Sequence, residues 1–125
     1  MKVKNVVIEM RSVKSVLHEA GQIMERLRKG EKVEPKFGVG FENVEAFRKV
    51  MTDKRMELLR VIKAKSPDSI YGLAKIVGRD LKSVNTDISV LKDMGLVSLE
   101  KEPNERRRVR PVVDFDKLNV EIALS

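Results

Sequence analysis

The sequence predicts an α+β fold. Between residues 52 and 95, three segments carry apolar residues at helical spacing. After Gly95 the apolar period changes to two, and Pro103-Asn104 supplies a turn before a second alternating segment, which predicts a β-hairpin. Three helices followed by a hairpin are the layout of a winged helix-turn-helix, so we expect this fold with an N-terminal strand-helix extension and a C-terminal strand.

The composition excludes several classes of protein. The chain has 125 residues, no cysteine and a single histidine, His18, which leaves no basis for disulfides, thiolate metal sites or Ser–His catalysis. No apolar run approaches the length needed to cross a bilayer. We therefore expect a cytoplasmic protein with no membrane association, metal or cofactor. The net charge of +7, from 26 Lys+Arg against 19 Asp+Glu, suits a polyanionic partner such as nucleic acid.

The flanking segments differ from the central one. Residues 3–10 are predicted to form a strand and residues 13–29 an amphipathic helix, while 31–42, with Pro35, is expected to be an irregular connection. The alternating segment 118–124 predicts a strand that can join a sheet. The expected organisation is an N-terminal strand and helix that are candidates for dimerisation (1–42), a winged helix-turn-helix domain (43–113) and a C-terminal strand (114–125).

Capping residues set the predicted helix boundaries. Each predicted helix follows a side chain that can accept a hydrogen bond from the first turn, and these are Asn43, Thr52, Ser69 and Asp80. Ser66-Pro67 ends the second of these helices and Gly78 the third, where a positive φ is inexpensive only for glycine. Ala74 is small where the two helices of the motif must approach each other closely.

The last helix carries the candidate DNA-reading face. Its apolar residues Leu81, Val84, Ile88 and Leu91 share one face and are expected to be buried. The residues then left outside are Lys82, Ser83, Asn85, Thr86 and Ser89, which can donate hydrogen bonds to phosphates and base edges. Asn pairs bidentately with adenine, and the major groove admits an α-helix. The alternative is an ordinary solvated helix surface.

The hairpin is dense in arginine. In an extended strand Arg106, Arg108 and Arg110 lie on one face and Arg107 on the other. Such a row can contact the phosphates that flank a minor groove. The alternative is a surface of cross-strand ion pairs with Glu100, Glu102 and Glu105.

Two stretches, SPDSIYGLAKIVGRD and DISVLKDMGLV, followed by RRRVRPVVDFDKL, resemble a prokaryotic family of predicted winged-helix transcriptional regulators that is loosely MarR-like. The resemblance implies binding of double-stranded DNA as a homodimer, with a recognition helix at Leu81–Met94 and a wing at Leu96–Val113. It places Arg79 in the turn before that helix, where it is either a phosphate contact or part of a surface ion pair. Ser69 and Tyr71 are further candidates for DNA contact. A carboxylate facing DNA would repel phosphate, so Asp87 is expected to pair with a neighbouring Arg or Lys.

Alternative functions remain at this point. A winged helix can serve as a scaffold or an antitoxin-like module with a protein partner, because fold does not fix function. An RNA reader would normally display stacking aromatics, and Tyr71 is the one candidate, so duplex DNA is favoured. We expect no catalysis. No enclosed pocket is expected around Asp114 and Asp116. Gly38-Val39-Gly40 lacks the sequence context of a phosphate-binding loop.

Overall fold

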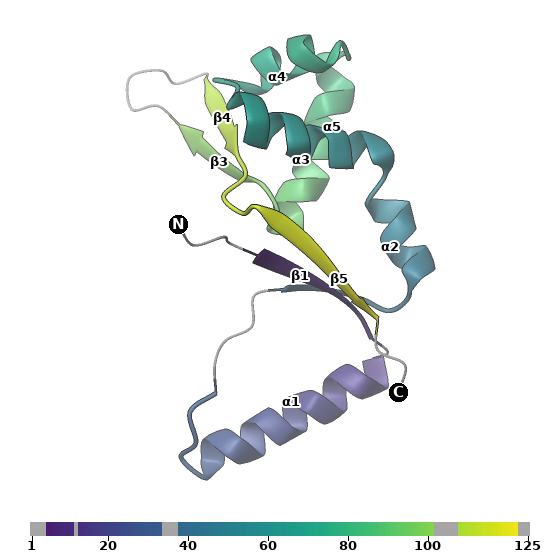
Figure 1. Ribbon diagram of the computed structural model, residues 1–125, viewed down its shortest axis with the longest axis vertical. Coiled ribbons are helices and arrows are strands. Elements are labelled where there is room, and N and C mark those ends of the chain that lie inside the picture. The colour runs from purple at the N-terminus through teal and green to yellow at the C-terminus, as the bar shows by residue number, and fades with distance from the viewer. Residues whose placement is uncertain (1–4, 12, 34–37, 102–107, 123–125) are drawn as a thin grey trace. The chain divides into compact units, whose positions relative to one another are not determined.

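The computed structural model describes residues 5–11, 13–33, 38–101 and 108–122. The chain forms two compact units (Figure 1). One unit comprises Met1–Lys49 together with Lys117–Ser125, and the other is the continuous stretch Val50–Asp116. The second unit therefore begins at Val50, whereas the sequence predicted a domain start at residue 43. The C-terminal strand belongs with the N-terminal segment because it pairs with it.

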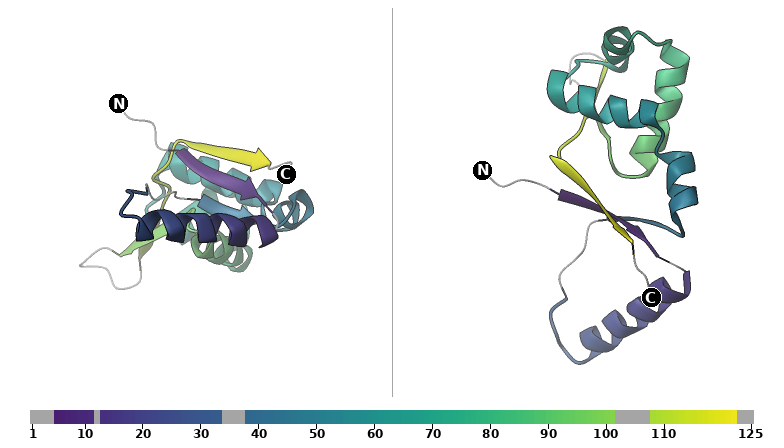
Figure 2. Two further views of the ribbon diagram at one scale, coloured as in Figure 1. Left: turned by 90° about the horizontal axis from the view of Figure 1, so that it is seen from below. Right: turned by 45° about the vertical axis from the view of Figure 1, so that its right-hand side comes forward.

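The N-terminal unit is built on a parallel sheet with the order β2-β1-β5. The central strand β1 (Asn5–Met10) pairs on one side with β2 (Gly38–Phe41) and on the other with β5 (Lys117–Ile122). Both views in Figure 2 show β5 alongside β1, and in the register Ile8 lies opposite Val39 and Val120. The predicted irregular connection at 31–42 is wrong for residues 38–41. Glycine contributes no side chain to a period-two pattern, so this short edge strand left no signal in the sequence.

Two helices complete this unit. Helix α1 (Val13–Arg28) follows β1 and matches the predicted helix 13–29 closely. The side chain of Arg11 forms an ion pair with Glu19 of α1. Helix α2 (Val44–Val50) begins after Asn43, whose side-chain oxygen accepts a hydrogen bond from the Ala46 backbone N–H at 2.8 Å. None of the side chains described in α1 is buried, although a helix that connects two parallel strands ordinarily covers a face of their sheet.

The second unit is a winged helix-turn-helix, as predicted. Its three helices are α3 (Asp53–Lys65), α4 (Ile70–Val77) and α5 (Leu81–Asp93). A two-stranded antiparallel hairpin follows, β3 (Ser98–Lys101) with β4 (Val109–Val112), in which Glu100 lies opposite Arg110. The core is aliphatic, and its most deeply buried side chains are those of Leu58, Leu73, Val84, Ile88, Leu91, Leu96 and Pro111. The predicted turn at Pro103-Asn104 lies outside the described residues.

Local hydrogen bonds fix the helix-turn-helix as expected. The hydroxyl of Thr52 accepts from the Arg55 N–H at 3.3 Å, and that of Ser69 accepts from the Gly72 N–H at 2.9 Å. Gly78 ends α4 at φ +68°, in the left-handed region that other residues adopt only with strain. The carboxylate of Asp80 then accepts from the Ser83 N–H at 2.8 Å and starts α5. These caps set the start and the direction of α5.

Candidate nucleic-acid interface

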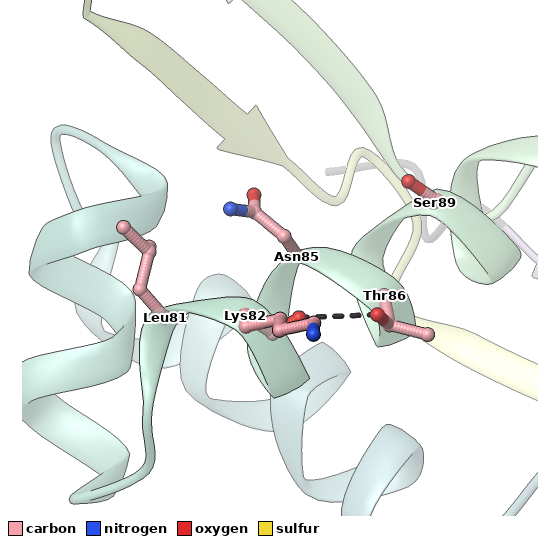
Figure 3. A pocket seen from close by; sticks show the side chains of 5 residues that line it. All are labelled: Leu81, Lys82, Asn85, Thr86 and Ser89. Carbon is pink, nitrogen blue, oxygen red and sulfur yellow. Dashed lines mark hydrogen bonds between the residues drawn. The ribbon is translucent and has the colours of Figure 1, made fainter.

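Helix α5 separates its side chains into a buried and an exposed face. Val84, Ile88 and Leu91 are 0–1% exposed and hold the helix on the core. On the other face the structure brings together Lys82, Asn85, Thr86 and Ser89, all of them exposed. With Leu81 they line an open hollow of about 550 Å³ (Figure 3). Four of the five predicted polar residues therefore form one continuous surface.

Some hydrogen-bonding groups of the predicted polar residues already bind within the chain, and others do not. The Ser83 hydroxyl donates to the Asp80 carboxylate at 2.8 Å, so it belongs to the helix cap. The Thr86 hydroxyl donates to the Lys82 backbone carbonyl at 3.1 Å. Among the residues that the structure describes, the side chains of Asn85 and Ser89 have no hydrogen-bond partner. Their donors and acceptors are available to a ligand.

Leu81 differs from the prediction. It was expected to be buried with Val84, but its side chain is 42% exposed and lines the same hollow as Asn85. The reason is its position at the first residue of α5, since a side chain at the end of a helix has core neighbours on one side only. Periodicity assigns a residue to a face of the helix and carries no information on how far along the helix the core extends.

Asp87 links the recognition helix to the rest of the motif. Its carboxylate accepts hydrogen bonds from Arg79 Nη2 at 2.6 Å and from Arg55 Nε at 3.0 Å. The predicted pairing of Asp87 with a basic neighbour is confirmed. Arg55 was not anticipated as a partner, because it lies 32 residues earlier on α3 and no local pattern connects the two. The Arg55 guanidinium also donates to the Val50 carbonyl at 2.7 Å.

Arg79 adopts the ion-pair alternative of the two that the sequence allowed. Its side chain is only 19% exposed, and Nη1 is buried without a hydrogen-bond partner among the described residues. A guanidinium held inside the motif in this way links the turn to α5 through Asp87. Arg79 and Asp87 are eight residues apart in the sequence, and this separation was not used to predict that they pair with each other.

Two carboxylates of the motif have lowered pKa values. Burial acts to raise the pKa of Asp87, but the hydrogen bonds from Arg79 and Arg55 outweigh it and leave the pKa below its ordinary value. The pKa of Asp80 is lowered chiefly by the hydrogen bond from the Ser83 backbone N–H, with a second contribution from the Ser83 hydroxyl. Both groups are therefore ionised at neutral pH.

The wing presents two described arginines. Arg108 and Arg110 are exposed, and both form ion pairs within the unit. Arg108 Nη1 lies 3.5 Å from the Asp68 carboxylate, and Arg110 Nη2 lies 2.5 Å from Glu100 across the hairpin. The cross-strand pair is the alternative arrangement that the sequence allowed. Arg106 and Arg107 lie outside the described residues.

The start of α4 contributes the remaining candidates. The Ser69 hydroxyl is occupied by capping α4 and by donating to the Asp68 carboxylate at 3.2 Å. Tyr71 is 58% exposed, and the Lys75 ammonium lies 4.8 Å from the centre of its ring. Tyr71 and Lys75 therefore form a small cationic and aromatic surface on α4.

The described part of the chain holds no cluster of three or more His, Cys, Asp or Glu side chains with the geometry of a metal site. Within the same residues, no helix is both long and apolar enough to cross a membrane.

Three helices, a hairpin and an exposed polar face on the last helix define a winged helix-turn-helix protein. The chain belongs to the HVO_A0114 family, whose family model matches residues 50–120, the whole of the winged helix and most of β5. No curated protein matches the chain.

Among solved structures, the chain is similar to RV1404 from Mycobacterium tuberculosis, at 15% sequence identity and a TM-score of 0.49. A MarR-like transcriptional regulator from Thermotoga maritima is similar at 18% identity and a TM-score of 0.47. Each match covers 82% of this chain. The chain spans 65% and 64% of the length of these two proteins, respectively.

Proposed function

We propose that this protein binds double-stranded DNA in a sequence-specific manner, with α5 in the major groove, and that it acts as a transcriptional regulator. The observation that carries the proposal is the exposed row Lys82, Asn85 and Ser89 on the face of α5 opposite its buried residues. Asn85 and Ser89 can hydrogen-bond to base edges, and Lys82 can neutralise a phosphate. An apolar or acidic face would instead favour a protein partner.

The wing is proposed to hold the DNA backbone. Arg106, Arg107, Arg108 and Arg110 give this hairpin a local excess of positive charge that the fold itself does not require. The side chains of Arg108 and Arg110 are 50% and 44% exposed, and exposed ion pairs contribute about 1 kcal/mol or less to stability. Exchanging Asp68 or Glu100 for a phosphate therefore costs little, and it releases counterions from the duplex.

Tyr71 and Lys82 are proposed as phosphate contacts, from α4 and α5 respectively. The remaining candidates Ser69, Arg79, Ser83 and Thr86 are proposed to act by fixing the two helices, because their side chains already bind within the motif.

We further propose that the protein acts as a homodimer, since one winged helix reads only a few base pairs and two half-sites about one helical turn apart multiply specificity. Helix α1 supports this. Its exposed apolar side chains include Val16, Leu17, Met24 and Leu27, at 47–70% exposure. Their positions are nearly symmetric about Ala20, so an antiparallel copy of the helix would set Val16 against Met24 and Leu17 against Ile23. Strand β5, an edge of its sheet, is the other candidate element.

The alternative function is a scaffold or antitoxin-like module that binds another protein. One experiment separates it from the proposal. The pure protein is titrated against pooled genomic duplex fragments at several salt concentrations, and the fragments that remain bound are sequenced. A regulator enriches a few sites above a salt-sensitive background, and paired half-sites reveal the dimer. Loss of all binding by about physiological salt, with no enrichment, contradicts the proposal and favours a protein partner.

A further inference from the structure

An apolar side chain lies within the polar surface of α5. Leu81 is 42% exposed and borders the hollow that Lys82, Asn85, Thr86 and Ser89 also line. In Figure 3 the side chains of Leu81 and Asn85 project to the same side of the helix, one turn apart. Because Leu81 is the first residue of α5 and lies beyond the core, it leaves an apolar contact surface beside the unengaged amide of Asn85.

The spacing of the two side chains suits neighbouring base pairs. Residues four apart on a helix have Cβ atoms about 5–6 Å apart, which is less than two steps of the DNA base stack at about 3.4 Å each. Asn pairs bidentately with N6 and N7 of adenine. In the major groove thymine alone among the four bases carries a methyl group, and its recognition is by apolar contact. Leu81 supplies that contact next to Asn85.

We propose that Leu81 is a specificity-determining residue that packs against the C5-methyl group of a thymine, within one or two base pairs of an adenine bound by Asn85. This inference rests on the proposed DNA-binding function and adds the base composition of the half-site. The bound sequence contains adjacent or nearly adjacent A·T pairs, and part of their recognition is apolar. Lys82 and Ser89, on either side, contact the backbone and the neighbouring bases.

The test removes only the methyl group. Sites are first selected from a random-sequence duplex pool with the full-length protein. Each thymine of the selected site is then replaced by deoxyuridine, which keeps base pairing and loses the C5-methyl. Affinities are measured for the wild type, for Leu81→Ala and for Val44→Ala. Val44 is a matched control because it is the first residue of α2 and is also 42% exposed.

At one thymine, deoxyuridine is expected to weaken wild-type binding about fourfold, the effect of losing one buried methyl group. Val44→Ala retains this sensitivity. Leu81→Ala binds the thymine site more weakly but no longer distinguishes thymine from deoxyuridine, so the two changes are coupled. Thermal unfolding of Leu81→Ala confirms that the variant is folded.

Three results would overturn the inference, and the third would also overturn the proposed function. If the wild type selects a site but tolerates deoxyuridine at every thymine, or if Leu81→Ala keeps its sensitivity, Leu81 does not read a methyl group and the proposed function survives. If no sequence is selected from the pool, the proposed function fails and the inference fails with it.

Discussion

Arg79 and Asp87 join the turn of the helix-turn-helix to the middle of its second helix, with 2.6 Å between Nη2 and Oδ2. The same carboxylate accepts from Arg55 of α3, so one acidic side chain connects three parts of the motif. Asp87 is on the inner side of α5, at 9% exposure, and the candidate DNA-reading residues are on the outer side. The direction in which α5 presents them therefore depends on a polar contact made behind it.

Replacing Asp87 by Asn is expected to destabilise the protein. The variant leaves two part-buried guanidinium groups without a counter-charge, and an unsatisfied buried polar group costs about 1–3 kcal/mol. The free energy of unfolding, measured by urea denaturation, should fall by about that amount. Asp93→Asn, at an exposed site at the end of the same helix, is the control and should change stability by about 0.5 kcal/mol or less. Equal losses in the two variants would contradict this role.

The contribution of Asp87 to stability is expected to depend on pH. Since its pKa is lower in the folded than in the unfolded protein, its contribution is complete above the unfolded value of about 4 and declines as the pH falls through the folded value. Urea denaturation of the wild type and Asp87→Asn between pH 7 and pH 3 measures this directly. The difference in unfolding free energy should be constant down to about pH 5 and then narrow. A difference that stays the same at pH 3 would show that the carboxylate charge is not involved.

Charge reversal in the wing is expected to weaken binding to every duplex. Arg106→Glu with Arg108→Glu removes two proposed phosphate contacts, so the slope of log affinity against log salt should become shallower by about 2. Fluorescence anisotropy at four or five salt concentrations gives the slope. Arg48→Glu with Lys49→Glu, at the end of α2, changes the net charge equally and is the control. A slope equally reduced in both double variants would assign the effect to net charge alone.

Asn85→Ala is expected to relax sequence preference and to leave non-specific affinity nearly intact. Loss of a bidentate base contact removes about 1–3 kcal/mol of discrimination at one base pair. Competition between the selected site and its single-base variants measures the change. Asn119→Ala, at an exposed asparagine of β5, should leave the preference unaltered. A uniform loss of affinity on all sequences would place Asn85 on the backbone rather than on a base.

Replacing one exposed apolar side chain of α1 by lysine is expected to dissociate the proposed dimer into monomers. Leu17 is 66% exposed and would lie against an apolar residue of the second copy, so Leu17→Lys buries a charge in the interface. Sedimentation equilibrium should show a monomer for this variant and a dimer for the wild type. Gln22→Lys adds the same charge on the opposite face of the helix and should remain dimeric. Dimers in both variants would move the interface away from α1, with β5 as the next candidate.

The helix-turn-helix could be predicted from sequence because its signals are local. Thr52, Ser69 and Asp80 cap the helices that follow them, and Gly78 adopts the expected positive φ. Strand β2 could not be predicted, since its pairing with β1 depends on residues about 30 positions away and its two glycines carry no pattern. The polar face of α5 was predicted because it is the complement of the buried face.

Two features of the site could not be predicted from the sequence pattern, because they depend on which parts of the chain lie close together in the fold. The exposure of Leu81 is set by where the core ends along α5. The partner of Arg79 is set by the turn that brings Asp87 back toward it. In both cases the sequence indicates a candidate residue but not its neighbours, because those neighbours come from other segments of the chain.

The pairing of β1 with β5 can form only after Val50–Asp116 has been synthesised. The central strand β1 of the parallel sheet leaves the ribosome before β5, the strand that pairs with its second edge. All of Val50–Asp116 lies between them in the sequence and is complete before β5 appears. Domains generally fold as units during synthesis. We therefore expect the winged helix to be folded, and its arginine-rich hairpin already formed, while one edge of β1 is still open.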